Sequence, residues 1–127
     1  MNLPELKIGK LVAQVPIIQG GMAIRLSTAP LAAAVANEGG IGLIAASGMG
    51  LDELRKEIRM ARELTGGKGI IGINAMVAAR QFLDLITTAA EEGIDLIVAG
   101  AGFSRDIFAV GKKYGVEVVP IVSSARL

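Results

Sequence analysis

The stretch Pro16-Ile17-Ile18-Gln19-Gly20-Gly21-Met22-Ala23 decides how the rest of the chain is interpreted. Its first half is apolar and β-branched, and a proline is tolerated at the first residue of a strand, so we expect a short buried strand over 16–19. The glycine pair that follows permits a sharp turn and removes side chains that would keep a ligand away. Backbone N–H groups there need acceptors, which a phosphate or a flat heteroaromatic ring can supply. A tight turn without a ligand is the alternative.

The same arrangement of apolar strand, small-residue loop and helix recurs along the chain at roughly 25-residue spacing. Both faces of the expected strands are apolar, which is typical of parallel strands covered by helices. We therefore expect one α/β domain over residues 1–127, in which residues 1–14 form a hairpin or cap. The later strands are expected at 41–46, 70–76, 96–99 and 118–122, and the helices around 31–38, 51–61, 82–89 and 107–114.

Two architectures fit this pattern. One is a flavodoxin-like, doubly wound sheet of five parallel strands, and the other is part of a (β/α)₈ barrel, which normally needs about 250 residues. Both place the functional loops at the carboxyl ends of the strands. The loops expected on that rim are Gln19-Gly20-Gly21, Ser47-Gly48, Asn74, Gly100-Ala101-Gly102 and Ser123-Ser124.

The composition excludes several classes of function. The chain has 13 basic and 12 acidic residues, a net charge of +1, and so lacks the basic footprint of a protein that binds nucleic acid or an anionic membrane. It contains no cysteine and no histidine, so we expect no disulfide and no metal site. The longest weakly polar run, residues 69–79, is too short to cross a bilayer. We expect a soluble, cytoplasmic protein that acts on a small molecule.

Asn74 is the candidate binding residue that this pattern singles out. It places an amide near the end of an otherwise apolar strand, and a buried amide without partners costs about 1–3 kcal/mol. A structural hydrogen bond to a neighbouring strand end would satisfy it. We favour a bond to a ligand, because four other small-residue strand ends should lie beside it on the rim.

Four segments together resemble one family of enzymes: residues 16–23, residues 31–42 (LAAAVANEGGIG), residues 72–76 (GINAM) and residues 100–102 (GAG). In this order they resemble the nitronate monooxygenase family, formerly called 2-nitropropane dioxygenases. The flavin-dependent enoyl-acyl-carrier-protein reductases share the pattern. The resemblance implies a TIM barrel of eight β/α units that holds FMN at its carboxyl-end rim. This chain would then supply the first five parallel strands and four helices.

The resemblance also implies roles for residues on the rim. The flavin ring would contact backbone, with Asn74 hydrogen-bonded to the flavin or its phosphate side and Gly100 leaving room beneath it. The implied backbone contacts are Gly21, Met22 and Ala23, and the residues implied to border the substrate are Ser47 and Gly48.

The chain departs from the family in length. Family members are much longer, and their phosphate-binding loops and catalytic histidine follow the later strands, so the catalytic residue is expected beyond Leu127. The resemblance implies oxidation of alkyl nitronates by FMN and O₂, with enoyl reduction as the alternative. A non-catalytic fragment or a flavin-binding module is a third interpretation. We expect residues 1–127 alone to be inactive, and to self-associate or to pair with the missing C-terminal half.

Overall fold

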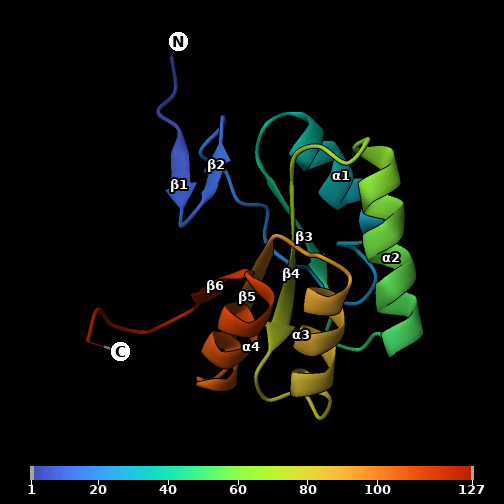
Figure 1. The fold of residues 1–127 in the computed structure, drawn as a ribbon, viewed down its shortest axis with the longest axis vertical. Coiled ribbons are helices and arrows are strands. Elements are labelled where there is room, and N and C mark those ends of the chain that lie inside the picture. The colour runs from blue at the N-terminus through green and yellow to red at the C-terminus, as the bar shows by residue number, and fades with distance from the viewer. Residues whose placement is uncertain (1, 127) are drawn as a thin grey trace.

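The computed structural model describes residues 2–126, which form a small hairpin beside a parallel sheet with helices (Figure 1). The parallel sheet has four strands in the order β3-β4-β5-β6, and the hairpin pairs β1 with β2 in antiparallel register. The elements in chain order are β1 (Leu6–Ile8), β2 (Leu11–Ala13), α1 (Ala29–Asn37), β3 (Ile41–Ala45), α2 (Leu51–Leu64), β4 (Ile70–Met76), α3 (Phe82–Glu91), β5 (Leu96–Gly100), α4 (Asp106–Tyr114) and β6 (Glu117–Pro120).

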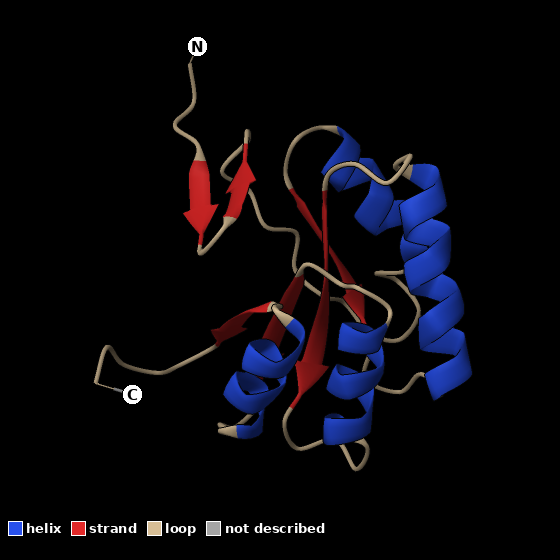
Figure 2. Cartoon of the chain, viewed as in Figure 1, coloured by secondary structure: helices blue, strands red, loops and turns tan. Residues whose placement is uncertain are grey.

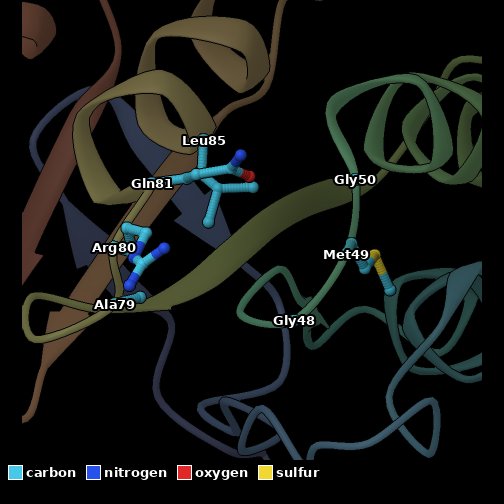
Figure 3. A pocket seen from close by; sticks show the side chains of 7 residues that line it. All are labelled: Gly48, Met49, Gly50, Ala79, Arg80, Gln81 and Leu85. Carbon is cyan, nitrogen blue, oxygen red and sulfur yellow. The ribbon is translucent and has the colours of Figure 1, made fainter.

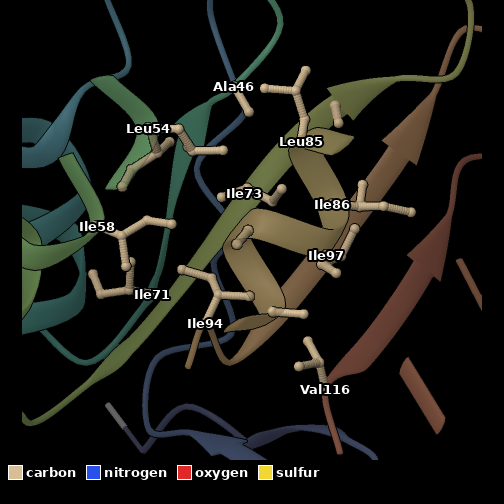
Figure 4. Close-up of a cluster of buried hydrophobic side chains, with 14 of the residues drawn as sticks. Ala46, Leu54, Ile58, Ile71, Ile73, Leu85, Ile86, Ile94, Ile97 and Val116 are labelled. Carbon is tan, nitrogen blue, oxygen red and sulfur yellow. The ribbon is translucent and has the colours of Figure 1, made fainter. Parts of the chain in front are cut away.

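The four helices cover one face of the parallel sheet, as Figure 2 shows. Alternate strand residues point to this face because side chains change sides at every residue of a strand. They meet the apolar stripes of α2 and α3 in the larger hydrophobic cluster (Figure 4). Its fully buried members include Ile44, Ile71, Ile73 and Ile97 from strands, and Leu54, Ile58 and Ile86 from helices.

The other face of the sheet is covered only at its amino-terminal end. There the hairpin packs its partly buried Leu6, Ile8 and Leu11 against a second buried cluster. The members of that cluster from the parallel sheet are Ile41, Leu43, Ile70, Leu96 and Val98, and Ala13 of β2 completes it. This arrangement explains why the strands are apolar on both faces, and it leaves the carboxyl-terminal part of the face open.

Contacts at the turn of the hairpin attach it to the sheet. The Lys10 N–H donates to Glu117 Oε1 over 3.1 Å, and the Lys10 ammonium donates to the Gly115 carbonyl. Gly9 has a φ of +54°, and a Cβ there would lie 2.2 Å from the Glu117 carboxyl carbon. Only glycine permits this approach, because the backbone is left-handed and the carboxylate occupies the side-chain position.

The strand expected over 16–19 is a correction. This segment makes one parallel bridge, between Ile18 and Ile41, and forms no strand of the sheet. The Ile41 N–H donates to Ile17 O over 2.9 Å and the Gln19 N–H donates to Ile41 O over 3.0 Å. At the next position the Gln19 side chain, and not its backbone, accepts the Leu43 N–H over 3.1 Å. The expectation of five parallel strands was therefore wrong: the described residues form four, and a single bridge stands where the other was expected.

The inward face of α1 consists of small side chains. Leu31 and Val35 are only partly buried, whereas the buried face consists of alanines at 29, 32, 33 and 36. The reason is the close approach of α1 to β3, where a Cβ on Gly42 would lie 1.9 Å from the Ala32 carbonyl oxygen. Only small side chains fit between elements this close.

The sequence pattern over 107–114 predicts that Phe108 of α4 points inward, and this prediction was wrong. The side chain is 44% exposed and its ring centroid lies 6.1 Å from that of Phe103. The buried residues of α4 are Ile107, Val110 and Gly111.

Candidate functional site

The open part of the sheet face brings Asn74 together with the glycine turn. Asn74 pairs in register with Ala45 on β3 and Val98 on β5, and its Nδ2 lies 3.4 Å from Val98 O. A Cβ on Gly21 would lie 2.4 Å from Asn74 Cβ and 2.9 Å from Asn74 Oδ1. The backbone of Gly21 therefore lies against the Asn74 side chain, and any residue larger than glycine would displace one of them. Asn74 remains partly exposed, so its amide is accessible at this edge.

Gly100 ends β5 beside this pair, opposite Met76 in the register. It is buried, and a Cβ there would lie 3.0 Å from Cδ1 of Ile121. The Met76 side chain is 47% exposed and that of Ile121 is 59% exposed. The site is thus an accessible amide flanked by exposed apolar side chains and by backbone without side chains.

The loop from Gly20 to Ser27 is held by one hydroxyl that the sequence interpretation missed. Ser27 is fully buried, and its Oγ accepts the Met22 N–H over 2.8 Å and Gln19 Nε2 over 2.9 Å. The same oxygen donates to Gly20 O over 3.2 Å. Its backbone N–H donates to Met22 O over 2.9 Å, while its carbonyl accepts the Ala45 N–H over 2.9 Å. Ser27 thus joins both ends of the loop to β3.

From sequence, Ser27 and Thr28 look like the cap of α1, but neither side chain caps it. Thr28 is the N-cap residue and makes no side-chain cap hydrogen bond. The Ala29 N–H at the start of the helix donates instead to Glu57 Oε2 of α2, over 2.6 Å. Only the three-dimensional packing of α2 beside α1 reveals this cap.

The three residues expected to present backbone to a cofactor differ in availability. Met22 has no free backbone polar group, because its N–H and its carbonyl both bond to Ser27. Met22 can contact a ligand through its side chain, which is 46% exposed. Within residues 2–126 the N–H groups of Gly21 and Ala23 have no hydrogen-bond acceptor. Gly21 and Ala23 therefore each keep a backbone donor for a ligand, and the N–H groups of residues 20 and 24–26 in the same loop also have no acceptor among the described residues.

The two residues expected to border a substrate lie on the loop after β3. Ser47 Oγ accepts the Met76 N–H over 2.8 Å, so this hydroxyl joins the loop to the end of β4. Gly48 has a φ of +87° and lines a groove of about 390 Å³ (Figure 3). The side chains of Arg80, Gln81 and Leu85 line the same groove. Its lining includes none of Gly21, Asn74 and Gly100, so Gly48 and the candidate cofactor residues do not share one cavity.

An ion pair joins the glycine loop to α2. Arg25 contacts Glu53 through two hydrogen bonds, Nε to Oε1 at 2.9 Å and Nη2 to Oε2 at 3.1 Å. The hydrogen bond from Arg25 lowers the pKa of Glu53, and the same bond raises the pKa of Arg25. Both groups are therefore charged near neutral pH, so the pair contributes a fixed position for the loop and no proton transfer.

Residues 2–126 lack two other kinds of functional feature. They contain no group of three or more side chains that could hold a metal ion. Among the same residues, no helix combines the length and the apolar character needed to cross a membrane.

The comparison with protein families identifies the chain. The family model for nitronate monooxygenase matches residues 5–125. The chain belongs to the nitronate monooxygenase family. Members of this family are flavin-dependent oxidoreductases.

Related proteins agree with the family and show the fold. FabK from Thermotoga maritima is 36% identical, with a TM-score of 0.79 over 86% of this chain. Nitroalkane oxidase from Streptomyces ansochromogenes, 22% identical, supports the fold alone, with a TM-score of 0.73 over 85% of the chain. These structures are TIM barrels, so the parallel sheet is part of such a barrel and the flavodoxin-like alternative is set aside.

The chain is much shorter than these relatives. It covers 34% of the FabK chain and 40% of the nitroalkane oxidase chain. A Mycobacterium tuberculosis protein, (3aS,4S,5R,7aS)-5-hydroxy-7a-methyl-1-oxo-octahydro-1H-indene-4-carboxyl-CoA dehydrogenase, is 29% identical over 111 residues, which are 87% of this chain and 30% of that protein.

Proposed function

We propose that residues 1–127 supply the N-terminal part of an FMN-dependent barrel oxidoreductase that oxidises alkyl nitronates with O₂. The observation that carries the proposal is the backbone of Gly21 lying against the accessible amide of Asn74 at the open end of the sheet face. The hairpin covers the opposite end of the same face, so the rim is the end of the face at which we expect a ligand to enter.

The residues at this rim fit a flat heteroaromatic ring. A ring of this kind presents hydrogen-bonding atoms at its edge and apolar faces, and ligand sites usually combine a few polar groups with apolar lining. The N–H groups of Gly21 and Ala23 and the amide of Asn74 would bind the edge. The exposed side chains of Met22 and Met76 would cover apolar surface.

The chain's own contribution to the reaction is binding and orientation. When bound, FMN supplies the electron transfer between substrate and O₂. Asn74 and the Gly21 backbone would hold its ring, and the hairpin below them would exclude water from the amino-terminal end of the barrel. The sequence offers no histidine, so a histidine base, if the reaction uses one, would come from another part of the barrel.

Reduction of an enoyl thioester is the second candidate activity. The likeness to FabK, an enoyl-acyl-carrier-protein reductase, favours it, because the 36% identity exceeds the 22% identity to nitroalkane oxidase. The M. tuberculosis relative is named as acting on a carboxyl-CoA compound, which also points to a thioester. Both candidates use the same flavin rim and differ in the substrate.

A chimera tests the proposal with defined material. Residues 1–127 would replace the matched third of Thermotoga maritima FabK, which restores a barrel of the full length. We expect a yellow protein that releases FMN on denaturation and consumes O₂ with an alkyl nitronate faster than FabK itself does. A colourless protein that takes up no FMN would contradict the cofactor assignment. Bound FMN without nitronate oxidation would support the second candidate.

A further inference from the structure

The hydroxyl of Ser27 is used to its full capacity by the glycine loop. A serine hydroxyl has one donor and two acceptor positions. In Ser27 the donor goes to Gly20 O, and the acceptors receive the Met22 N–H and Gln19 Nε2. The side chain is fully buried, so water cannot take over any of these bonds.

These bonds serve the loop and not the helix that follows it. The first N–H of α1 bonds to Glu57, and the N-cap residue, Thr28, contributes no side-chain bond. Ser27 is therefore free of the capping role that a serine before a helix usually has. Its three side-chain bonds all go to residues 19–22, the segment that contacts Asn74.

Gln19 extends this connection to the sheet. Its Nε2 donates to Ser27 Oγ, and its Oε1 accepts the Leu43 N–H of β3 over 3.1 Å. Side-chain hydrogen bonds thus fix the position of the loop relative to β3, the strand next to Asn74. They take the place of the backbone hydrogen bonds that a longer strand would form with β3.

We propose that Ser27 is a positioning residue for the flavin: its buried hydroxyl holds the Gly20–Met22 backbone against Asn74 and so sets the affinity of the rim for FMN. The inference rests on the proposed function. Ser27 itself contacts no ligand. It takes up the Met22 N–H and fixes the backbone of Gly21 against Asn74, where the Gly21 N–H stays without an acceptor in the described residues.

The test compares Ser27→Ala with Thr65→Ala in the FabK chimera. Thr65 is also a buried hydroxyl, bonded to Ala61 O and Arg62 O at the end of α2, but it contacts no residue of the glycine loop. Both variants should lower the melting temperature. We expect only Ser27→Ala to weaken FMN binding, by 10- to 100-fold in a fluorescence titration, and to shift the absorption bands of the bound flavin.

Two further readouts keep the test decisive. Ser27→Cys, which retains a weak donor at nearly the same volume, should give intermediate FMN affinity and serves if Ser27→Ala does not fold. Hydrogen exchange of residues 20–26 should speed up in Ser27→Ala while exchange of β4 stays unchanged.

FMN affinity within twofold of the unsubstituted chimera, or unchanged exchange of the loop, would overturn the inference. If the unsubstituted chimera binds no FMN, the proposed function is contradicted as well. If the chimera binds FMN and the Ser27 variants bind it equally well, only the inference about Ser27 is contradicted.

Discussion

At the residue scale, the contact between Gly21 and Asn74 organises the candidate site. At this contact the glycine has no side chain that would displace the amide. The amide, in turn, is a polar group on an otherwise apolar face. Hydrogen bonding to Val98 O at 3.4 Å is long for an amide, so Asn74 is only loosely held by the protein alone. This geometry suits a residue whose main partner is a ligand.

Asn74→Ala is expected to weaken FMN binding in the completed barrel by about 1–3 kcal/mol, the usual range for losing a buried hydrogen-bond partner. The unfolding free energy of the flavin-free protein should change less, because the bond to Val98 O is long. Paired titrations and urea denaturation of the apo and FMN-bound forms measure both effects. Equal loss of stability in the two forms, with unchanged FMN affinity, would make Asn74 structural.

The glycine pair permits a matched comparison at adjacent positions. Gly21→Ala places a Cβ 2.4 Å from Asn74 Cβ, whereas a Cβ at Gly20 has no atom within 4 Å. Gly21→Ala should therefore displace the loop or the amide and lower FMN affinity at least tenfold, or about 1.4 kcal/mol. Gly20→Ala should change it less than threefold. If both variants bind FMN equally well, the contact between Gly21 and Asn74 does not shape the cofactor site.

At the element scale, the sequence pattern predicts a strand or helix correctly where the burial of one face is enough to determine its type. The stripe of Leu54, Ile58 and Ala61 predicts α2 well, because the period of its apolar residues matches a helix packed on one side. The segment 16–19 was misjudged, since its apolar residues indicate burial but cannot indicate that the Gln19 side chain replaces strand pairing. The inward face of α1 could not be predicted from the helix alone, because the close approach of α1 to β3 depends on Gly42 of that strand.

Contacts between distant parts of the chain also limit what the sequence predicts about the site. Asn74 and the glycine turn are candidates from the sequence because a lone amide in an apolar segment and a glycine pair after one are visible in the residues themselves. Ser27 could not be distinguished from a helix cap, because the competing cap, Glu57, lies 28 residues away from Ala29 in the chain. Nothing in the sequence marks that approach of two helices.

The packing of α1 on β3 gives a stability prediction. Gly42→Ala would place a Cβ 1.9 Å from the Ala32 carbonyl oxygen, so α1 must shift away from the sheet. We expect the unfolding free energy to fall by about 1–3 kcal/mol, the usual cost of overpacking a core. Gly20→Ala is the control, since Gly20 is exposed, has no positive φ and a Cβ there has no atom within 4 Å. Urea denaturation in which both variants match the unsubstituted protein would show that the approach of helix and strand is not tight.

The ion pair between α2 and α3 predicts a dependence of stability on pH. Glu92 accepts two hydrogen bonds from Arg59, at 2.8 and 2.7 Å, and these lower the pKa of Glu92 in the folded protein. Its contribution is therefore complete above the ordinary glutamate pKa, about 4.3, and is lost as the pH falls through the lowered value. Glu92→Gln should destabilise the protein at pH 7 and make little difference near pH 2. The exposed Glu63→Gln is the control, and a Glu92→Gln effect that is the same at both pH values would contradict this account.

At the scale of the whole molecule, the parallel sheet is one part of a barrel, and this part has two open edges. One edge is the segment 16–19, where Ile17 is 57% exposed, and the other is β6, whose residues are all only partly buried. A groove of about 360 Å³ beside the first edge is lined by Val15, Ile17, Ala34, Val35, Glu38 and Gly40. Apolar surface of this kind is stabilised by burial against another chain segment.

We propose that residues 1–127 alone associate through these edges, or pair with the C-terminal part of a barrel. Light scattering should show a mass that rises with protein concentration. Ile17→Lys places a charge in the groove and should reduce association, whereas Met60→Lys, at a position on α2 that is 44% exposed, should not. A monomer that shows no concentration dependence would demonstrate that both edges are stable in water.

The central claim is that FMN binds where Gly21 meets Asn74, and a crystal structure of the FMN-loaded chimera tests it most directly. The account predicts that the flavin ring contacts the Gly21 backbone and accepts or donates a hydrogen bond at the Asn74 amide, on the open face above the hairpin. Flavin bound elsewhere, such as in the groove beside Arg80, with Gly21 and Asn74 still in contact only with each other, would contradict it.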